Sequence, residues 1–454
     1  MSAQHEHWSG RVGFLLATIG SAIGLGSIWK FPYEVGANGG GVFVLCYLAG
    51  LVLIVLPLFL TELAIGRRGQ MDAAASMAAV AVGSGRSPRW ALVGVLGIVT
   101  ASLILSFYSV IGSWALAYGV DAAGGGLAVI DAAGAQSRFA ALLASPGRIG
   151  LYHSLFMLMT GLIVAKGVAG GLERASKVLM PILMALITVL AAYSLIEGDA
   201  VKTLHFLFAV DVSRLTPAIV LDALGLGFFS IGVGLAVMIT YAAYANANIN
   251  LTETAIVTIL GDTAISFLAG FAVFPVVFAE NLDPSGGPGL VFVTLPLAFA
   301  HMPAGGIAGF AFFVLLVIAA LCSAISMLEM PVAWLCRTKG WSRPSATLGA
   351  GLACWAAGFA TVLSFNLWKA WHPLGFLGTF GTATVFDLLD YLTSNVLLPL
   401  GGVLLAVFAG WVIPTRVIAR ELELGPKAAA LVGSALRFVV PVGIGAVTFA
   451  HLFG

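Results

Sequence analysis

Several carboxylates of this sequence lie inside apolar segments, where folding alone gives little reason for a charged residue. Asp262 lies in the stretch ILGDTAISF, with no basic residue near it in sequence. Burying an unpaired charge is costly, so an ionised carboxylate in such surroundings needs a partner. A bound cation would be a natural partner. The alternative is a carboxylate held by serine hydroxyls and freed backbone groups. Either way, Asp262 is a candidate binding residue.

Three further polar residues lie in apolar stretches. Glu62 precedes Arg67 and Arg68, so a structural salt bridge and a functional role both remain open for it. Glu329 is expected to be a structural or gating carboxylate. Tyr108, in LSFYSVIGSW, needs a partner for its hydroxyl if it lies in hydrocarbon. We predict that Tyr108 contacts a ligand, with helix packing as the alternative.

The composition places these residues in a membrane. Hydrophobic residues make up 60% of the 454 residues and charged residues only 9%, whereas soluble domains carry about 25% charge. The net charge of +1 and the lack of a basic run give no sign of nucleic-acid binding. The four cysteines lack metal-ligand spacing, so we expect neither zinc nor a disulfide. The chain is therefore an all-α polytopic membrane protein.

Eleven segments are apolar enough to span a bilayer, which requires about 20 residues each. They are predicted near 11–34, 41–66, 91–120, 151–168, 176–197, 216–244, 254–279, 306–336, 346–364, 380–411 and 428–452. If the N-terminus is cytoplasmic, most lysines and arginines lie in segments on the inner side of the membrane. Because positive residues favour the cytoplasmic side, we predict a cytoplasmic N-terminus and an external C-terminus. No connecting loop is large enough for a second domain.

The first of these spans is interrupted. Gly20, Gly24 and Gly26 follow an apolar helical stretch within seven positions, and the segment ends at Pro32. Glycine weakens a helix by about 1 kcal/mol relative to alanine. Broken backbone at membrane depth persists where it is buried in protein or lines a cavity. The alternative is a kinked helix whose glycines permit close packing.

A second interruption lies five spans later, where Gly232 and Gly234 punctuate the stretch 225–244. Paired interruptions at corresponding positions are typical of inverted five-helix repeats, whose binding site lies between them. The sequence therefore predicts repeat one over about 11–197, repeat two over about 216–411, and an extra helix over about 428–452. It also predicts that spans one and six are unwound midway.

These motifs resemble the neurotransmitter:sodium symporters, which have the leucine-transporter fold. The resemblance begins with GSAIGLGSIWKFP and NGGGVF, continues through ELAIGR, GGLERASKVLMP, FFSIGVG and MITYAAY, and ends with FDLLDYLTSNVLLPLGG. It covers essentially the whole chain in order. The eleven-span form is similar to the bacterial amino-acid transporter branch.

The resemblance implies a substrate site between the two interruptions. The carboxylate would meet freed amides and the Tyr108 hydroxyl, the ammonium would meet carbonyls, and the side chain would lie among apolar residues. The implied substrate-binding residues are Ser21, Ala22, Leu25, Gly26, Ile104, Tyr108, Phe229, Ser230, Gly232, Leu235, Ser323 and Met327.

The resemblance also implies two sodium sites. Site one comprises Ala22, Ser27, Ser230 and Asp262, and site two comprises Gly20, Ile23, Ala319, Cys322 and Ser323. Ser27 stands where the family usually has asparagine, and Cys322 replaces an oxygen ligand, although sulfur suits sodium poorly. Leu226 replaces a glutamine near the chloride position of animal members, and Ser266 replaces a glutamate of some bacterial members.

The implied gates also depart from the family. Lys30 replaces an arginine at the outer gate, where Asp390 and Phe229 are the other expected members. At the inner gate the usual arginine–aspartate pair becomes His5 and Arg337. Near the fifth span, Gly171 and Pro181 form a Gly-x9-Pro pattern that resembles one in bacterial members and predicts a hinge. A loop glycine followed by an ordinary first-turn proline is the alternative.

The resulting prediction is a bacterial inner-membrane transporter and not an enzyme, since no catalytic triad, phosphate loop or metal cluster is evident. We expect it to carry a neutral, bulky hydrophobic amino acid with sodium by alternating access, independently of chloride. Its expected partners are the amino acid, sodium and the bilayer, without cofactor, nucleic acid or obligate protein partner. A sodium-independent or proton-coupled carrier and a non-transporting amino-acid sensor are the alternatives.

Overall fold

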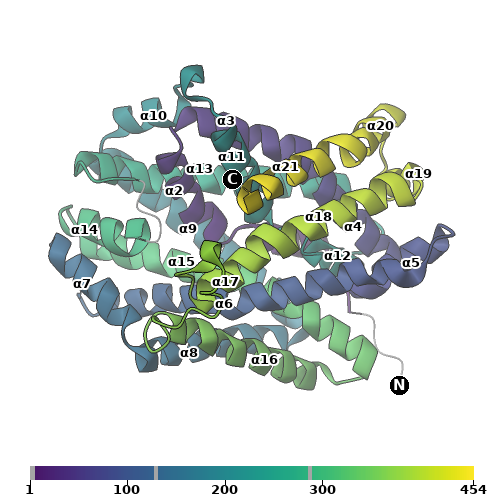
Figure 1. Ribbon diagram of the computed structural model, residues 1–454, viewed down its shortest axis with the longest axis horizontal. Helices are drawn as coiled ribbons and strands as arrows, with labels where there is room; N and C mark the ends of the chain where they lie inside the picture. Colours follow the sequence, from purple (N-terminus) through teal and green to yellow (C-terminus); the bar gives the residue numbers. More distant parts are fainter. Residues whose placement is uncertain (1–5, 127–130, 285–288, 454) are drawn as a thin grey trace.

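The computed structural model describes residues 6–126, 131–284 and 289–453, and the regular elements in these ranges are all helical. Long helices lie side by side in one bundle, with short helices at both of its ends (Figure 1). Within these ranges nine helices are long and apolar enough to cross a membrane, or ten if one bent pair is counted as a span. The prediction of an all-helical polytopic protein is thus confirmed.

The helices follow one another with short connections. In chain order the α-helices are α1 (Arg11–Ala22), α2 (Phe31–Ala37), α3 (Gly41–Gly50), α4 (Leu56–Gly69), α5 (Ala73–Gly83), α6 (Ala91–Ala123), α7 (Ala132–Leu143), α8 (Pro146–Val164), α9 (Arg174–Glu197), α10 (Ala200–Phe208), α11 (Pro217–Ile231), α12 (Val237–Ala243), α13 (Leu251–Ala279), α14 (Leu295–Ala300), α15 (Gly305–Lys339), α16 (Arg343–Ser364), α17 (Val385–Tyr391), α18 (Leu398–Val407), α19 (Thr415–Glu421), α20 (Pro426–Ser434) and α21 (Val440–Phe453). Short π and 3-10 turns connect or extend them: η1 (Gly26–Lys30), η2 (Leu51–Val55), η3 (Pro88–Trp90), η4 (Val168–Glu173), η5 (Val212–Arg214), η6 (Leu290–Thr294), η7 (Gly378–Phe380), η8 (Leu392–Leu397), η9 (Phe408–Val412) and η10 (Ala435–Val439).

Local sequence explains where several helices begin. The Thr216 hydroxyl accepts a hydrogen bond from the amide of Ile219 (3.2 Å), and Pro217 occupies the first turn of α11. The Asn250 side chain caps α13 by accepting from the amide of Glu253 at 2.9 Å. Such side-chain acceptors satisfy amides that the first helical turn leaves free.

The predicted loops contain helices of their own. α5 lies in the segment 67–90, α7 in 121–150 and α14 in 280–305, although residues 127–130 and 285–288 are outside the described ranges. Alanine-rich stretches such as 73–81 have high intrinsic helix propensity, which explains why α5 and α7 form between the predicted spans.

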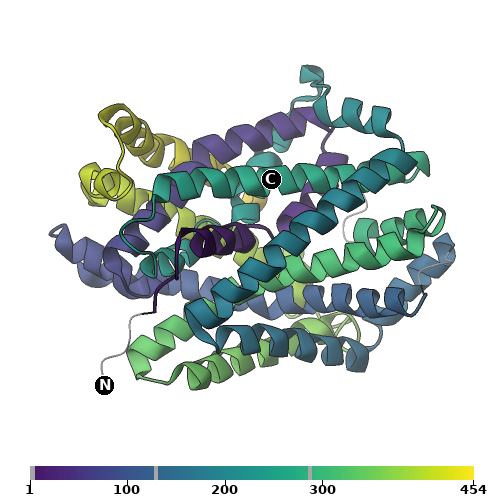
Figure 2. The ribbon, with the colours of Figure 1, turned by 180° about the vertical axis from the view of Figure 1, so that it is seen from behind.

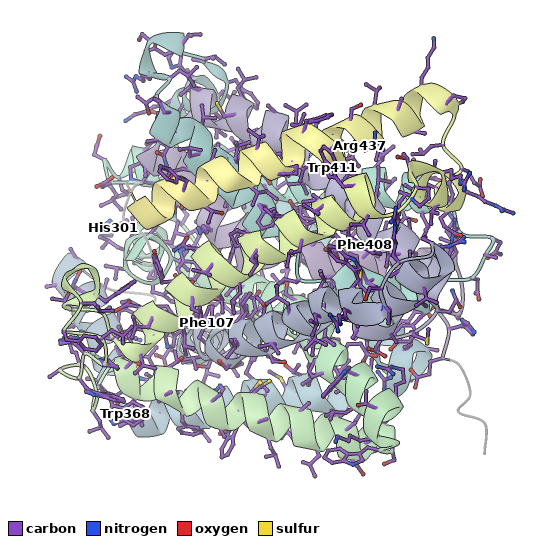
Figure 3. The ribbon with its side chains drawn as sticks, turned by 45° about the vertical axis from the view of Figure 1, so that its right-hand side comes forward. Phe107, His301, Trp368, Phe408, Trp411 and Arg437 are labelled. Atoms are coloured by element: carbon purple, nitrogen blue, oxygen red, sulfur yellow. The ribbon has the colours of Figure 1, made fainter. Side chains whose placement is uncertain are left out.

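Helix α1 lies inside the bundle. It packs against α9, α13 and α15, and the view from behind shows its dark purple ribbon among these helices, with the N-terminal segment leading to it (Figure 2). The later helices cover another side, where α21 packs on α18. Trp411 and Arg437 lie close together there, and the Trp411 indole donates to the Arg437 carbonyl at 3.2 Å (Figure 3). The interrupted first helix is thus enclosed by later parts of the chain.

Candidate functional site

The first helix breaks within the glycine-rich stretch. α1 ends at Ala22, Ile23 adopts extended geometry, and the chain resumes in η1 and α2 along an axis bent by 51°. A Cβ atom added at Gly24 would lie 2.6 Å from the Ser323 hydroxyl oxygen and 2.9 Å from that of Tyr108. Glycine is therefore required here because polar side chains of α15 and α6 approach the backbone closely.

A second break separates α11 from α12. Gly232, Gly234 and Ala236 all have positive φ angles, of 69°, 91° and 60°. The Glu62 carboxylate accepts hydrogen bonds from the amides of Gly234 (2.7 Å) and Met238 (3.1 Å). A buried carboxylate thus satisfies the free amides at the N-terminus of α12, where negative charge is favoured.

The salt-bridge alternative for Glu62 is therefore wrong. Arg67 and Arg68 pair with Glu421 instead, at 3.4 and 3.0 Å. Glu62 is fully buried, and its position five and six residues before the arginines places it on another part of the α4 surface. Its position as the partner of the second break was missed from sequence, because Gly234 lies 172 residues further along the chain.

A cavity of about 60 Å³ lies between the two breaks. Eleven of the twelve predicted substrate-binding residues line it, and only Ala22 does not. The additional lining residues, which the sequence reasoning missed, are Gly24, Ile231, Val237, Ser326 and Leu398. Ser326 was detectable, because it lies three positions after Ser323 on one face of a helix.

One end of this cavity is polar and the rest is largely apolar. The Tyr108 hydroxyl accepts a hydrogen bond from the amide of Leu25 at 3.1 Å. The Ser323 hydroxyl lies 3.2 Å from the carbonyl oxygen of Ile23, to which it donates. Aliphatic side chains such as Ile104 and Leu235 line the remainder. This arrangement suits a small molecule with a charged or polar head and an apolar body.

Asp262 lies beside the cavity in a fully buried cluster of oxygen atoms. Its carboxylate accepts hydrogen bonds from the hydroxyls of Ser27, Tyr47 (3.3 Å) and Ser230 (3.5 Å). The Ser27 and Ser230 hydroxyls are 3.1 Å apart. Three of the four residues predicted for sodium site one therefore meet, and Tyr47 is an addition. Hard oxygen donors around one carboxylate fit an alkali cation.

The residues predicted for sodium site two are also close to one another. The Ser323 hydroxyl contacts the Ile23 carbonyl, and a Cβ added at Gly20 would lie 3.6 Å from the Cβ of Cys322. Cys322 is buried at this contact between α1 and α15. These residues place the Ile23 carbonyl and the Ser323 hydroxyl near Cys322, whose sulfur would coordinate sodium poorly.

On the predicted outer side, the ammonium of Lys30 lies 4.5 Å from the ring centroid of Phe229. Within the described ranges Lys30 and Asp390 form no salt bridge, and Asp390 accepts instead from the Ser394 hydroxyl at 3.0 Å. The ring of Phe292 packs against Trp29 of η1 and against Trp114, with centroid distances of 6.2 and 5.8 Å. Aromatic side chains therefore pack against η1, beyond the first break.

On the predicted inner side, the N-terminal segment closes the bundle. The Trp8 indole donates to the carbonyl of Tyr241 at 2.8 Å, and Trp8 is fully buried. Glu6 accepts from Arg343 at 2.9 Å, and the same guanidinium pairs with buried Glu329. These contacts join the N-terminal segment to α12, α15 and α16.

Of the two residues at the inner-gate positions, His5 lies outside the described residues and Arg337 pairs with Asp72. The role of Arg343 was missed, because the sequence does not show that the turn after α15 folds back onto Glu329. Glu329 was expected to be structural or gating, and its position in this network is compatible with both.

Interrupted helices around an enclosed, polar-headed cavity define a class of multi-pass membrane transporters. The comparisons with known proteins agree with this class. Residues 5–129 and 137–363 match the model of the sodium:neurotransmitter symporter family, and the chain belongs to this family.

Its relatives are sodium-dependent transporters. The chain is 36% identical over 457 residues to the sodium-dependent transporter YhdH of Bacillus subtilis (strain 168), covering 98% of this chain and 97% of that one. It is 28% identical over 380 residues to the sodium-dependent dopamine transporter of Bos taurus, covering 73% of this chain and 54% of that one. Among solved structures it is similar to MhsT in complex with L-phenylalanine, with a TM-score of 0.89 and 41% identity over 99% of this chain and 100% of that one.

These matches confirm the predicted family and the leucine-transporter fold. They also support sodium as the ion on which transport depends.

Proposed function

We propose that this chain is a sodium-coupled symporter of neutral amino acids with bulky apolar side chains. The observation that carries the proposal is the cavity between the two breaks, where the Leu25 amide and Tyr108 hydroxyl face a largely apolar lining. Freed amides and a hydroxyl suit a carboxylate, and freed carbonyls suit an ammonium group. The complex of the similar protein MhsT with L-phenylalanine supports a large side chain.

The proposal includes alternating access by eleven spans. We infer that α1 with η1 and α2, and α11 with α12, are the unwound spans one and six of the two repeats. The N-terminus would be cytoplasmic and the C-terminus external, in a bacterial inner membrane. Contacts on both sides of the cavity, at Phe292 and at Trp8, would have to open in turn.

Chloride independence would follow from the charge of Asp262. A zwitterion moving with sodium adds positive charge, which a fixed carboxylate offsets. Leu226, which stands where animal members have a glutamine, supplies no ligand for an anion, whereas Tyr47 and Ser230 direct their hydroxyls to the Asp262 carboxylate. The carboxylate therefore uses the donors that a bound anion would need.

A proton-coupled carrier is the second candidate. Asp262 contacts hydroxyl groups directly within the described structure, and Cys322 weakens the ligand set of sodium site two. A carboxylate so placed could carry a proton in place of an ion. This candidate differs from sodium symport only in the coupling ion.

Uptake of labelled L-phenylalanine into proteoliposomes separates the candidates. We expect accumulation driven by an inward sodium gradient, in chloride and in gluconate alike. Accumulation driven only by a proton gradient would establish the second candidate. Binding without uptake under either gradient would indicate a sensor, and both symport proposals would then be wrong.

A further inference from the structure

A groove runs along the surface between the packed helices α8 and α16. Figure 1 shows these two helices on the side of the bundle away from α21. Its cavity volume is about 320 Å³, and six residues of each segment line it. Its walls are mostly apolar, and the flanking leucines Leu158, Leu162, Leu348 and Leu352 are all more than half exposed. None of these residues belongs to the substrate cavity or the Asp262 cluster.

Glycines create the groove. A Cβ atom added at Gly351 would meet no atom within 4 Å, and one added at Gly161 would meet only the Thr347 methyl group at 3.9 Å. Neither glycine is required by backbone conformation, because both lie in regular helix with ordinary φ angles. The space is therefore open to an occupant from outside the chain.

The length of the groove matches one leaflet. It runs from Ala165 and Pro344 at the predicted cytoplasmic end to Ser154 and Trp355, where the Trp355 indole donates to the Ser154 hydroxyl at 2.9 Å. Eleven helical steps cover about 17 Å, roughly half of a hydrocarbon core of about 30 Å. This polar contact thus closes the groove near mid-bilayer, which suits an acyl chain of one leaflet.

The open end of the groove is basic. Lys166 directly follows Ala165, and Lys339 precedes the turn that leads to Pro344. Both lysines are exposed, and neither forms a salt bridge within the described ranges. Exposed Trp341 lies in the same turn, as is common at membrane interfaces. The nearby Glu6 carboxylate is already paired with Arg343 at 2.9 Å, so the two lysines favour an anionic headgroup there.

We propose that this groove binds an anionic phospholipid of the cytoplasmic leaflet, with one acyl chain between α8 and α16 and its headgroup at Lys166 and Lys339. The occupant is a lipid because the groove is recessed, has the depth of one leaflet and ends at basic side chains. This inference requires the predicted orientation of the chain but not the proposed substrate or coupling ion.

The test uses the full-length protein in nanodiscs with a trace of phosphatidylglycerol that carries a mid-chain diazirine. We expect cross-links to map to 154–165 and 344–355. Gly351→Leu should reduce these cross-links at least fivefold by filling the groove. Gly445→Leu is the matched control, since Gly445 is an exposed glycine of α21 with nothing within 4 Å of an added Cβ.

The headgroup is tested by lysine variants. Lys166→Gln and Lys339→Gln should each lower the preference for phosphatidylglycerol over phosphatidylcholine about fivefold, whereas Lys427→Gln, an exposed lysine of α20, should not. Cross-links outside the groove, or groove labelling unchanged by Gly351→Leu, would overturn the proposal. So would equal labelling by both phospholipids, or protein–protein cross-links at 344–355 that show a second copy in the groove.

Discussion

Removal of the Tyr108 hydroxyl should weaken amino-acid binding without unfolding the protein. The hydroxyl accepts from the Leu25 amide at 3.1 Å in a buried position at the polar end of the cavity. When a substrate carboxylate arrives, the hydroxyl is free to donate to it. A hydrogen bond to a charged group contributes about 1.5–3 kcal/mol, and a neutral one about 0.5–1.5 kcal/mol.

The net effect of Tyr108→Phe is the difference between bound and free states. In the bound state, the variant lacks the hydrogen bond to the substrate carboxylate. In the free state, it also lacks the hydrogen bond from the Leu25 amide, which the substrate satisfies once it is bound. We therefore expect a loss of about 1–2 kcal/mol in binding, equivalent to about 5- to 30-fold in Kd.

Titration of purified protein with L-phenylalanine by calorimetry measures this change. Tyr118→Phe is a matched control, because Tyr118 is a buried tyrosine of the same helix that does not line the cavity. Wild-type affinity in Tyr108→Phe would remove this hydroxyl from the binding site. An equal loss in Tyr118→Phe would show that helix packing, and not a substrate contact, accounts for the effect.

Four further predictions concern the ion, the pocket, the second break and the hinge. Asp262→Asn should abolish uptake or make it require chloride, whereas wild-type uptake should be equal in chloride and gluconate; wild-type failure in gluconate would refute the fixed-charge explanation. Leucine, methionine and aromatic amino acids should displace labelled L-phenylalanine, because Gly232 carries no side chain and Leu235 is the residue nearest to it; displacement only by glycine or alanine would contradict this. Glu62→Gln should lower the midpoint of thermal unfolding, since an amide replaces one acceptor oxygen by a donor and costs about 1–3 kcal/mol; an unchanged midpoint would refute the role of Glu62 at the second break. Hydrogen exchange at 171–181 should be faster under inward-facing than outward-facing conditions, and equal protection in both would count against a hinge there.

Local composition was sufficient to predict an all-helical protein with many apolar helices, although the described residues hold nine that could cross a membrane, or ten with the bent pair, where eleven were expected. The apolar segments and the clustered glycines act through helix propensity and through the cost of burying backbone groups. The eleven cavity residues were predicted through family motifs, because which side chains face one another across the bundle depends on the packing of distant segments. Ile231 and Leu398 illustrate the limit: they line the cavity, yet no local pattern distinguishes them from packing residues.

Charge pairing was the least predictable feature. Glu62 was placed beside Arg67 and Arg68 by sequence proximity, but helical geometry directs it to the amides of Gly234 and Met238 instead. In the same way, the partners of Arg343 come from the N-terminal segment and from α15. Distant partners such as Glu6, 337 residues before Arg343, are chosen by the tertiary fold, and the sequence indicates only that such charges require partners.

One residue links the proposed ion site to the cavity. Ser230 lines the cavity and also donates to Asp262, and a Cβ added at Gly26 would lie 3.1 Å from the Cα of Ser230. A cation bound at Asp262 would compete for the Ser230 oxygen and hold it against η1, thereby fixing the distance between the two breaks. An amino acid that requires this distance would bind more tightly with the ion present. Because such coupling is reciprocal, the amino acid must then increase the affinity for the ion by the same factor, and the same contact that positions the substrate would make its transport depend on sodium.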